Sequence, residues 1–328
     1  MTSPVPTTPT IAIATSAGGW YSPAMRLAML SAGLAAFAGC ASGAVESDAG
    51  PRTDARRTDA AITDGPSGDG PTTDARPVDA RPIDGPGGGT VAALQLTEIV
   101  LAPTGGEMIE IVNPGAVAVD LSTYYLSDTP GYFKLPAGVA MVGADSTDFV
   151  AKFPAGATLA PHAVATIAID SAANFTLAYP GVNPTYSLVS GPITVLTTGV
   201  ATLTNAGEPV ILFQWNGAAD RVVDVDIMVA GTPSAANLLV AKTPVDGPDA
   251  DSAATAYAID ALSIPSQTAP GAAKSTKRIA LESIATETPS GGNGLGGHDE
   301  TSEQTNVTWD SAAYTAPTPG VVPPALVP

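Results

Sequence analysis

The chain has 328 residues, a formal net charge of −18 and only 13 lysines and arginines. This charge argues against a nucleic-acid partner, because binding DNA or RNA requires basic side chains that replace the counterions of the phosphates. The single cysteine excludes an internal disulfide framework and any cysteine-based metal site, while 34 glycines and 31 prolines are typical of a turn-rich β protein.

The amino-terminal segment has the order of a secretory signal peptide. Arg26 is the only charged residue before Cys40, and it is followed by a short apolar run and then by small residues. The run is shorter than the roughly 20 apolar residues of a membrane-spanning helix. We therefore predict a signal peptide over residues 1–39 that starts at Met1 or at Met25.

The end of this segment, Phe37-Ala38-Gly39-Cys40, resembles the lipobox of bacterial lipoproteins, although leucine is commoner than phenylalanine at its first position. The resemblance implies that Cys40 is lipidated and becomes the first residue of the mature chain. The two residues after it lack the aspartate that resembles an inner-membrane retention signal. We therefore expect a lipid-anchored protein of the bacterial cell envelope, at the outer membrane or the cell surface.

Residues 40–90 are predicted to form a disordered linker after the lipidated cysteine. They contain almost no large apolar side chains and repeat a loose Asp-containing motif, TDAR at 53–56 and again at 73–76. Such a composition buries too little apolar surface to offset the entropy lost on ordering. The spacing of the aspartates drifts, unlike the fixed offsets of a calcium loop. A coil of about 50 residues spans roughly 40 Å, which suits a spacer.

From residue 91 the chain reads as a series of short strands separated by turns, which predicts an all-β sandwich over residues 91–322 and a tail over 323–328. The candidate strands are 94–101, 108–112, 149–152, 163–170, 200–204, 210–215, 222–228 and 279–284. Alanines and leucine over 252–262 indicate a single helix. Residues 107–128 predict a β-hairpin-like unit that turns at Asn113-Pro114-Gly115. Glu107 and Glu110 are three residues apart, which places them on opposite faces of the strand. We expect them to support the turn and to lie on an exposed strand face.

Several segments of this region resemble the lamin-tail domain, including its bacterial members. They are 96–99 (LTEI), 107–114 (EMIEIVNP), 119–122 (VDLS), 126–128 (LSD), 159–167 (LAPHAVATI), 203–212 (LTNAGEPVIL), 274–278 (KSTKR), 306–309 (NVTW) and 318–320 (TPG). The resemblance implies an immunoglobulin-like β-sandwich, a fold found in nuclear lamins and in secreted or surface proteins of bacteria. The chain departs from the family over 132–153, 170–198 and 230–273, which suggests enlarged loops and a place for specialised binding.

Few residues are candidates for chemistry. Histidine is the commonest general base, but His162 lies in a turn before a strand and His298 in a glycine-rich loop over 291–301 without the spacing of a phosphate loop. Asp246, Asp249 and Asp251 could offer carboxylates to calcium on one loop, although the bidentate glutamate of an EF-hand is missing.

Two further groups are predicted to be structural. The basic residues Lys274, Lys277 and Arg278 are interpreted as a solvated strand edge. Tyr124, Tyr125 and Trp215 are interpreted as core and edge aromatics rather than as a stacking platform.

These observations predict a non-catalytic interaction or adhesion module on a lipid-anchored stalk. Its partners would be the membrane, through the anchor, and an envelope or extracellular protein or polysaccharide. No nucleophile–base constellation is visible, so no catalytic residue and no cofactor is assigned. The alternatives are a calcium-dependent ligand binder and a metal-assisted hydrolase, with a site in the 246–251 and 291–301 loops.

Overall fold

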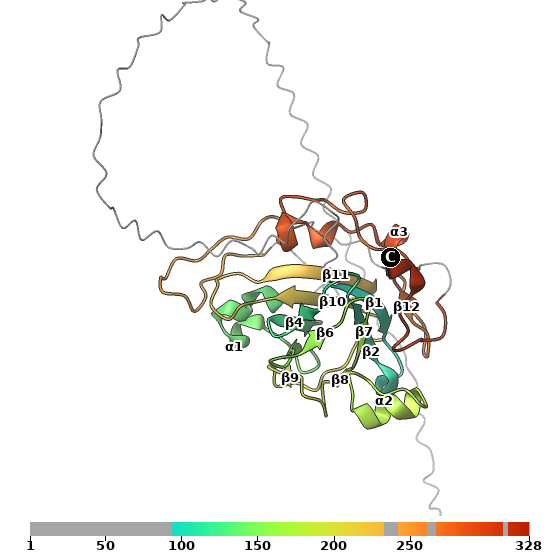
Figure 1. The fold of residues 1–328 in the computed structure, drawn as a ribbon. Coiled ribbons are helices and arrows are strands. Elements are labelled where there is room, and N and C mark those ends of the chain that lie inside the picture. The colour runs from blue at the N-terminus through green and yellow to red at the C-terminus, as the bar shows by residue number, and fades with distance from the viewer. Residues whose placement is uncertain (1–93, 233–241, 261–266, 311–313, 328) are drawn as a thin grey trace, which may run out of the picture. The chain divides into compact units, whose positions relative to one another are not determined.

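The computed structural model describes residues 94–232, 242–260, 267–310 and 314–327. These residues form a β-sandwich of two five-stranded sheets with short helices between the strands, which confirms the predicted all-β fold class (Figure 1). The predicted signal peptide, Cys40 and linker lie outside the described residues.

The first sheet has the order β12-β1-β2-β7-β8, antiparallel except for the parallel pair β7–β8. Its strands are β12 (Thr276–Lys277), β1 (Gln95–Val100), β2 (Met108–Val112), β7 (Val164–Ala168) and β8 (Tyr186–Ser187). The three long strands in its middle are the ones that the apolar runs predict. The two flanking strands come from segments with no such run.

The second sheet has the order β11-β10-β4-β5-β9 and is antiparallel throughout. Its strands are β11 (Val223–Gly231), β10 (Gly207–Gln214), β4 (Tyr124–Ser127), β5 (Val150–Lys152) and β9 (Thr194–Val195). A small two-stranded ribbon pairs β3 (Val119–Asp120) with β6 (Thr158–Leu159). The long pair β10–β11 turns at Asn216-Gly217, where the left-handed φ of 83° at Gly217 requires glycine.

The helices of the described residues are all short, and most lie in the segments between strands. They are η1 (Thr104–Gly106), η2 (Tyr132–Ala137), α1 (Val139–Val142), α2 (Ala172–Ala178), η4 (Leu295–Gly297), η5 (Glu300–Ser302), α3 (Thr305–Thr308) and η6 (Pro324–Leu326). The first turn of α2 is capped by Ser171, whose Oγ accepts a hydrogen bond from the Asn174 amide at 3.2 Å. Among the described helices, none has the length and hydrophobicity that crossing a bilayer demands.

The main core lies between the two sheets. Leu96, Ile109 and Ile167 of the first sheet and Leu126 and Leu212 of the second belong to one cluster and are almost entirely inaccessible to solvent. Each such side chain stabilises the fold by about 1.5–3 kcal/mol through removal from water. A second cluster, which includes Tyr125 and Phe213, covers the other face of the second sheet, so the strands are buried on both sides.

The predicted hairpin over residues 107–128 does not form. Strand β2 pairs with β1 and β7, whereas β3 pairs with β6 and β4 joins the second sheet. The segment after Asn113 therefore carries the chain from one sheet to the other. Asn113 fixes this crossing, because its Nδ2 donates to the carbonyls of Val117, Leu159 and Ala160 at 2.7–3.1 Å.

Glu107 and Glu110 are buried, contrary to the expectation of an exposed strand face. Glu107 accepts a hydrogen bond from the Leu203 amide at 3.1 Å. Glu110 accepts from the Thr166 hydroxyl at 2.7 Å and from the Gly320 amide at 2.6 Å. The C-terminal segment covers Glu110 on the outer face of the first sheet, through a bond that joins residues 210 positions apart. Glu107 is instead covered by the segment before β10, which contributes Leu203.

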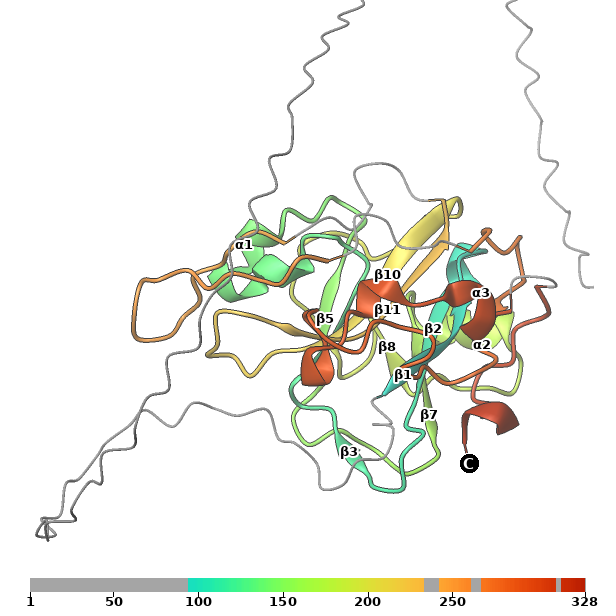
Figure 2. The ribbon, with the colours of Figure 1, turned by 90° about the horizontal axis from the view of Figure 1, so that it is seen from above.

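The C-terminal segment, orange to red in Figures 1 and 2, runs beside β1 and β11. It is tied to β1 by β12, to β11 by a bridge between Asp224 and Gly294, and to Glu98 through the Thr318 amide at 2.9 Å. Trp309 from this segment is fully buried in the main core. The sandwich is therefore complete only when both ends of the described region are present.

Three sequence-based assignments of secondary structure are wrong. Residues 200–204 do not form a strand, because they pair with no neighbouring strand. Their amides instead donate isolated hydrogen bonds to carbonyls of residues 146–147 and to the carboxylate of Glu107. Residues 279–284 leave β12 and enter a turn, with Ile279 half exposed. Residues 252–260 are not helical, since Tyr257 is drawn into the second cluster and its hydroxyl donates to the Phe133 carbonyl at 2.9 Å.

Candidate functional site

The 246–251 loop brings together a different set of aspartates from the one predicted. Single oxygens of Asp220, Asp246 and Asp249 all lie within 4.8 Å of one another, whereas Asp251 is not part of this group. The Asp251 carboxylate instead accepts a hydrogen bond from the Ala253 amide at 2.7 Å.

Asp220 is the residue of this group that sequence reasoning missed. It follows the β10–β11 turn and is buried, and its carboxylate accepts from the Gly247 amide at 2.9 Å and the Thr255 hydroxyl at 2.5 Å. The hydrogen bond from Thr255 lowers the pKa of Asp220, so the group stays ionised. No local signal links Asp220 to the loop, because their proximity depends on the fold.

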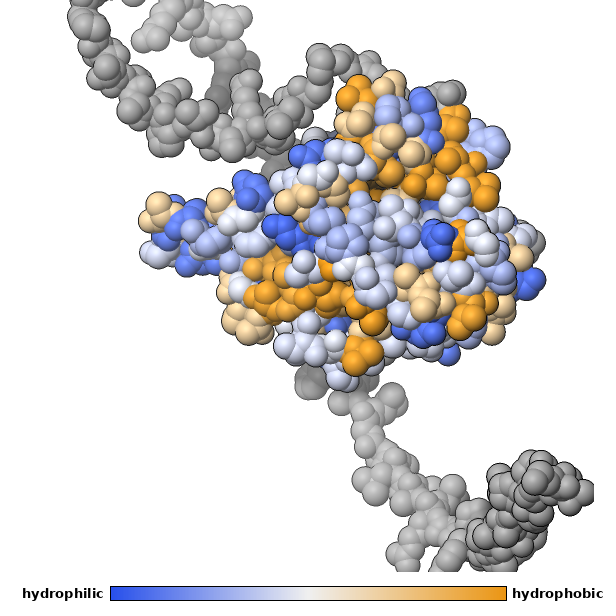
Figure 3. Space-filling model, turned by 60° about the horizontal axis from the view of Figure 1, so that its bottom comes forward, coloured by the Kyte–Doolittle hydropathy of each residue, from blue (hydrophilic) through white to orange (hydrophobic). Residues whose placement is uncertain are grey.

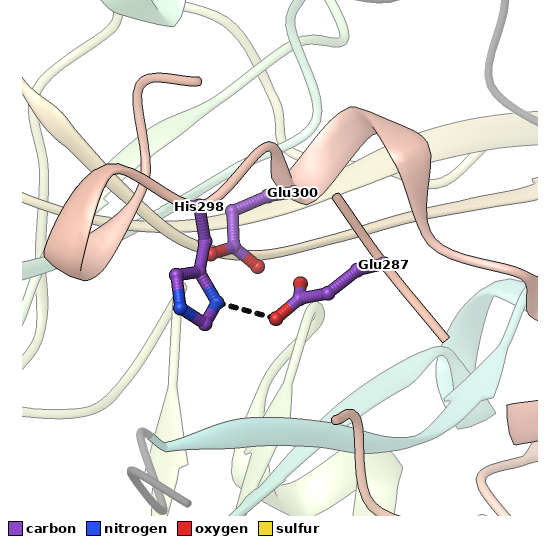
Figure 4. A group of neighbouring side chains, drawn as sticks. All are labelled: Glu287, His298 and Glu300. Atoms are coloured by element: carbon purple, nitrogen blue, oxygen red, sulfur yellow. Dashed lines mark hydrogen bonds and ion pairs between the residues drawn. The ribbon is translucent and has the colours of Figure 1, made fainter. Parts of the chain in front are cut away.

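The two histidines occupy different environments. His162 is exposed in a turn, with a positive φ of 57°, and its amide donates to the Asn113 carbonyl at 2.8 Å. His298 lies between Gly297 and η5, and its Nδ1 is 2.5 Å from Oε1 of Glu287. Glu300 brings a second carboxylate to the same point, so Glu287, His298 and Glu300 face one another (Figure 4).

The carboxylates of this group are more buried than the imidazole. The Glu287 side chain is 4% exposed and the His298 side chain 29%, while Glu300 is 5% exposed. Burial raises the pKa of Glu287. Burial, and then the charge of Glu287, raises the pKa of Glu300 well above its ordinary value. The sequence indicated His298 but neither glutamate.

The glycine-rich segment before His298 is shaped by close packing. A Cβ on Gly294 would lie 2.4 Å from Oε1 of Glu300, and one on Gly292 would lie 2.2 Å from the His298 carbonyl oxygen. The Gly294 amide donates to that same carbonyl at 2.8 Å. Glycine is needed here so that the backbone can pass beside Glu300 and His298.

Arg278 is buried, so the interpretation of the basic residues as a solvated strand edge is wrong for it. Its guanidinium lies 2.7 Å from Asp226, 3.0 Å from Glu282 and 2.6 Å from Glu303, and it stacks on Trp309 at 4.7 Å. The Arg278 Nε also donates to the Leu96 carbonyl at 2.6 Å. Arg278 therefore connects β1 of one sheet with β11 of the other.

A second buried cation lies near the first. Lys242 forms ion pairs with Asp224, at 2.9 Å, and with Asp260. The Tyr132 hydroxyl donates to Asp224 at 2.7 Å, and the Asn293 amide group donates to Asp260 at 2.5 Å. Both cations are held by carboxylates and neither faces solvent as a basic patch.

The predicted core aromatics pack as interpreted. The Tyr125 and Phe213 rings stack at 5.2 Å, and Trp215 lies 6.3 Å from Tyr125. Tyr124 is buried in the main core. These rings fill space and do not form an open platform.

The segment around α1 presents an apolar surface within the region predicted as an enlarged loop. A shallow hollow of about 300 Å³ is lined by residues 139–140, 143–145 and 197–198. Met141, from the same helix, does not line the hollow but is 57% exposed. Figure 3 shows that hydrophobic residues gather in patches on the face it displays.

Fold and topology define a β-sandwich module, and comparison with known families identifies it. Residues 89–227 match the family described as Lamin Tail Domain, which confirms the resemblance found in the sequence and the predicted immunoglobulin-like sandwich. A crystal structure of a DUF4876 family protein from Bacteroides thetaiotaomicron is similar with a TM-score of 0.37 and 16% identity, over 73% of this chain and 75% of that one. No curated protein matches the chain.

Proposed function

We propose that this chain is a lipid-anchored protein of the bacterial cell envelope that presents its lamin tail domain as a non-catalytic interaction module. One observation carries the proposal. The only cysteine of the chain, Cys40, stands at the end of a signal-like apolar segment and directly before the aspartate-rich linker that leads to the domain. A lipidated cysteine of this kind would carry a diacylglyceryl group on its sulfur and a third acyl chain on its amino group. Stable anchoring to a membrane requires only two such signals.

The residues after Cys40 indicate the cellular address, whereas the net charge and the surface of the domain indicate the class of partner. Ala41 and Ser42 lack the aspartate of an inner-membrane retention signal, which favours the outer membrane or the cell surface. The net charge of −18 disfavours nucleic acid, so the partner is an envelope or extracellular protein or polysaccharide. The apolar surface around Met141 favours a protein partner over a polysaccharide.

The substitution Cys40→Ser tests the anchor. We expect the unaltered chain to be recovered with membranes and to carry an acylated amino-terminal cysteine in peptide mass spectra. We expect the Cys40→Ser chain to lose this modification and to leave the membrane fraction, because a serine offers no thiol for the thioether. The control variant Ser42→Ala should stay with membranes.

A chain that remains in the membrane fraction as Cys40→Ser, or that carries an unmodified Cys40, would contradict the anchor. The module is tested separately by cross-linking the anchored chain on intact cells and identifying what it captures. Recovery of one envelope protein or polysaccharide, reduced by Met141→Glu, supports the proposal. The proposal is contradicted if the anchored chain captures no protein or polysaccharide in larger amount than the Cys40→Ser control does.

The second candidate is calcium-dependent ligand binding, which the group formed by Asp220, Asp246 and Asp249 favours. Extracellular calcium modules bind with dissociation constants of about 10⁻⁴–10⁻³ M through carboxylate and carbonyl oxygens. Three carboxylate oxygens within 4.8 Å of one another offer such ligands, one from the buried Asp220 and two from the exposed Asp246 and Asp249.

Calcium at a concentration about ten times its dissociation constant should raise the free energy of unfolding by about 1.4 kcal/mol. The melting temperature should therefore rise by a few degrees. We expect Asp249→Asn to abolish the shift and Asp251→Asn, on the same loop but outside the group, to retain it. Thermal unfolding with calcium and with magnesium measures this. An unchanged melting temperature at millimolar calcium removes this candidate.

A further inference from the structure

Glu300 is a buried carboxylate for which the described part of the chain supplies no partner. Glu300 is only 5% exposed to solvent. No hydrogen bond or ion pair from another described residue reaches its carboxylate. Oε2 of Glu287, beside it, is also buried without a hydrogen-bond partner. Buried carboxylate oxygens that bind neither a proton nor a cation are costly.

The surroundings of Glu300 contain more negative than positive groups. Seven carboxylates of the described residues gather in this region, against two permanent cations, Arg278 and Lys242. The carboxylates are those of Asp224, Asp226, Asp260, Glu282, Glu287, Glu300 and Glu303. Both cations have their ion pairs with other members of this set, and among the described residues neither forms an ion pair with Glu287 or Glu300.

We propose that Glu287, His298 and Glu300 form a binding site for a divalent transition metal ion, with Zn²⁺ as the best fit. One ligand atom from each residue lies within 4.8 Å of the other two, and the imidazole and both carboxylates point toward one another (Figure 4). An imidazole nitrogen with two carboxylate oxygens is a ligand set that zinc accepts, whereas calcium and magnesium take oxygen ligands.

The nitrogen that faces the carboxylates is Nδ1, which lies 2.5 Å from Oε1 of Glu287. A metal ion beside these two atoms would take the place of the hydrogen bond that now joins them. Three protein ligands leave the fourth tetrahedral position of zinc to water.

The site would hold the C-terminal segment against the second sheet. Glu287 and His298 flank the glycine-rich segment, which contacts β11 through the bridge between Gly294 and Asp224. A metal ion bound by both Glu287 and Glu300 would link the two ends of this segment. Because it adds two positive charges to an acidic region, it also stabilises the folded state.

The chain has only two histidines, which makes a site-specific experiment available. We would titrate the purified full chain with ZnCl₂ and follow the two histidine Cε1–H signals by NMR. The proposal expects one of the two signals to move to saturation at one equivalent of metal, together with a rise in the melting temperature. His162→Asn identifies the other signal, since asparagine tolerates the positive φ at this position.

Variants separate the metal site from general metal binding to an acidic surface. His298→Asn and Glu300→Gln should each weaken zinc affinity by at least about tenfold. The matched variant His162→Asn should retain the affinity of the unaltered chain. The proposal is overturned if neither histidine signal moves at several equivalents of zinc, if the His162 signal moves instead, or if folded Glu300→Gln binds zinc as the unaltered chain does.

Discussion

Replacing Arg278 with methionine should be the most destabilising single substitution among the charged residues of this domain. Methionine leaves Asp226, Glu282 and Glu303 buried around a vanished cation, and Oδ1 of Asp226 already lacks a hydrogen-bond partner. Removing one partner of a buried ion pair typically costs about 3–5 kcal/mol. We expect a loss of this size in the free energy of unfolding, measured by urea denaturation at neutral pH.

The neighbouring residue provides the control. The Lys277 side chain is 21% exposed and lies 3.6 Å from Glu98, so Lys277→Met should cost no more than about 1 kcal/mol. Arg278→Lys keeps the charge but loses the planar guanidinium that reaches several carboxylates at once, and its stability should be intermediate. Equal stabilities of Arg278→Met and Lys277→Met would show that the buried network does not hold the sheets together.

The second large effect is a fall in stability as the pH rises from about 5 to about 8. Burial raises the pKa of Glu107 and of Glu110 to about 7, whereas in the unfolded chain both groups titrate near 4.3. Between these values the folded state binds more protons than the unfolded state, so stability is lost as the pH rises through 7. Each unit of difference in pKa corresponds to about 1.4 kcal/mol, so the two groups together would lose about 5 kcal/mol between about pH 5 and about pH 7. Solvent screening reduces this value, and we expect a total loss of about 2–4 kcal/mol.

Glu110→Gln tests the origin of this effect. Glutamine keeps an acceptor for the Thr166 hydroxyl and the Gly320 amide but carries no charge at any pH. We expect the difference in unfolding free energy between pH 5 and pH 8 to be smaller in this variant than in the unaltered chain. Asp246→Asn, at an exposed position, should leave the difference unchanged. Equal stability of the unaltered chain at the two pH values would contradict the role of buried glutamates.

Sequence patterns were sufficient for the long strands and for β5 (predicted at 149–152), and insufficient for the two-residue strands. β1, β2, β7, β10 and β11 are marked by apolar runs that are buried on both faces. β8, β9 and β12 have two residues each, and neither periodicity nor composition distinguishes so short a strand from a loop. The prediction of a hairpin over residues 107–128 was wrong for a related reason. A turn signal in the sequence does not show whether the chain returns to the same sheet or crosses to the other one.

The buried charges could not be predicted because distant segments bury them. Glu98 and Glu110 have the spacing of ordinary strand residues, but Thr318 and Gly320 cover them from more than 200 residues away. Arg278 follows Lys277 in a segment that reads as basic, and only the fold places three carboxylates around it. For the candidate metal site, His298 was visible as one of two histidines, whereas Glu287 and Glu300 had no feature that set them apart.

The covering of the first sheet by the C-terminal segment determines when the domain can finish folding. Glu98 in the first strand meets Thr318, and Leu96 meets Arg278, across 220 and 182 residues. Contacts of such sequence separation are slow to form, because a long loop must close before any of them contributes. During synthesis, the carboxylates of the first strands therefore stay in water until the last part of the chain has emerged. A ribosome-bound chain that ends before Thr318 should remain incompletely folded and open to proteases.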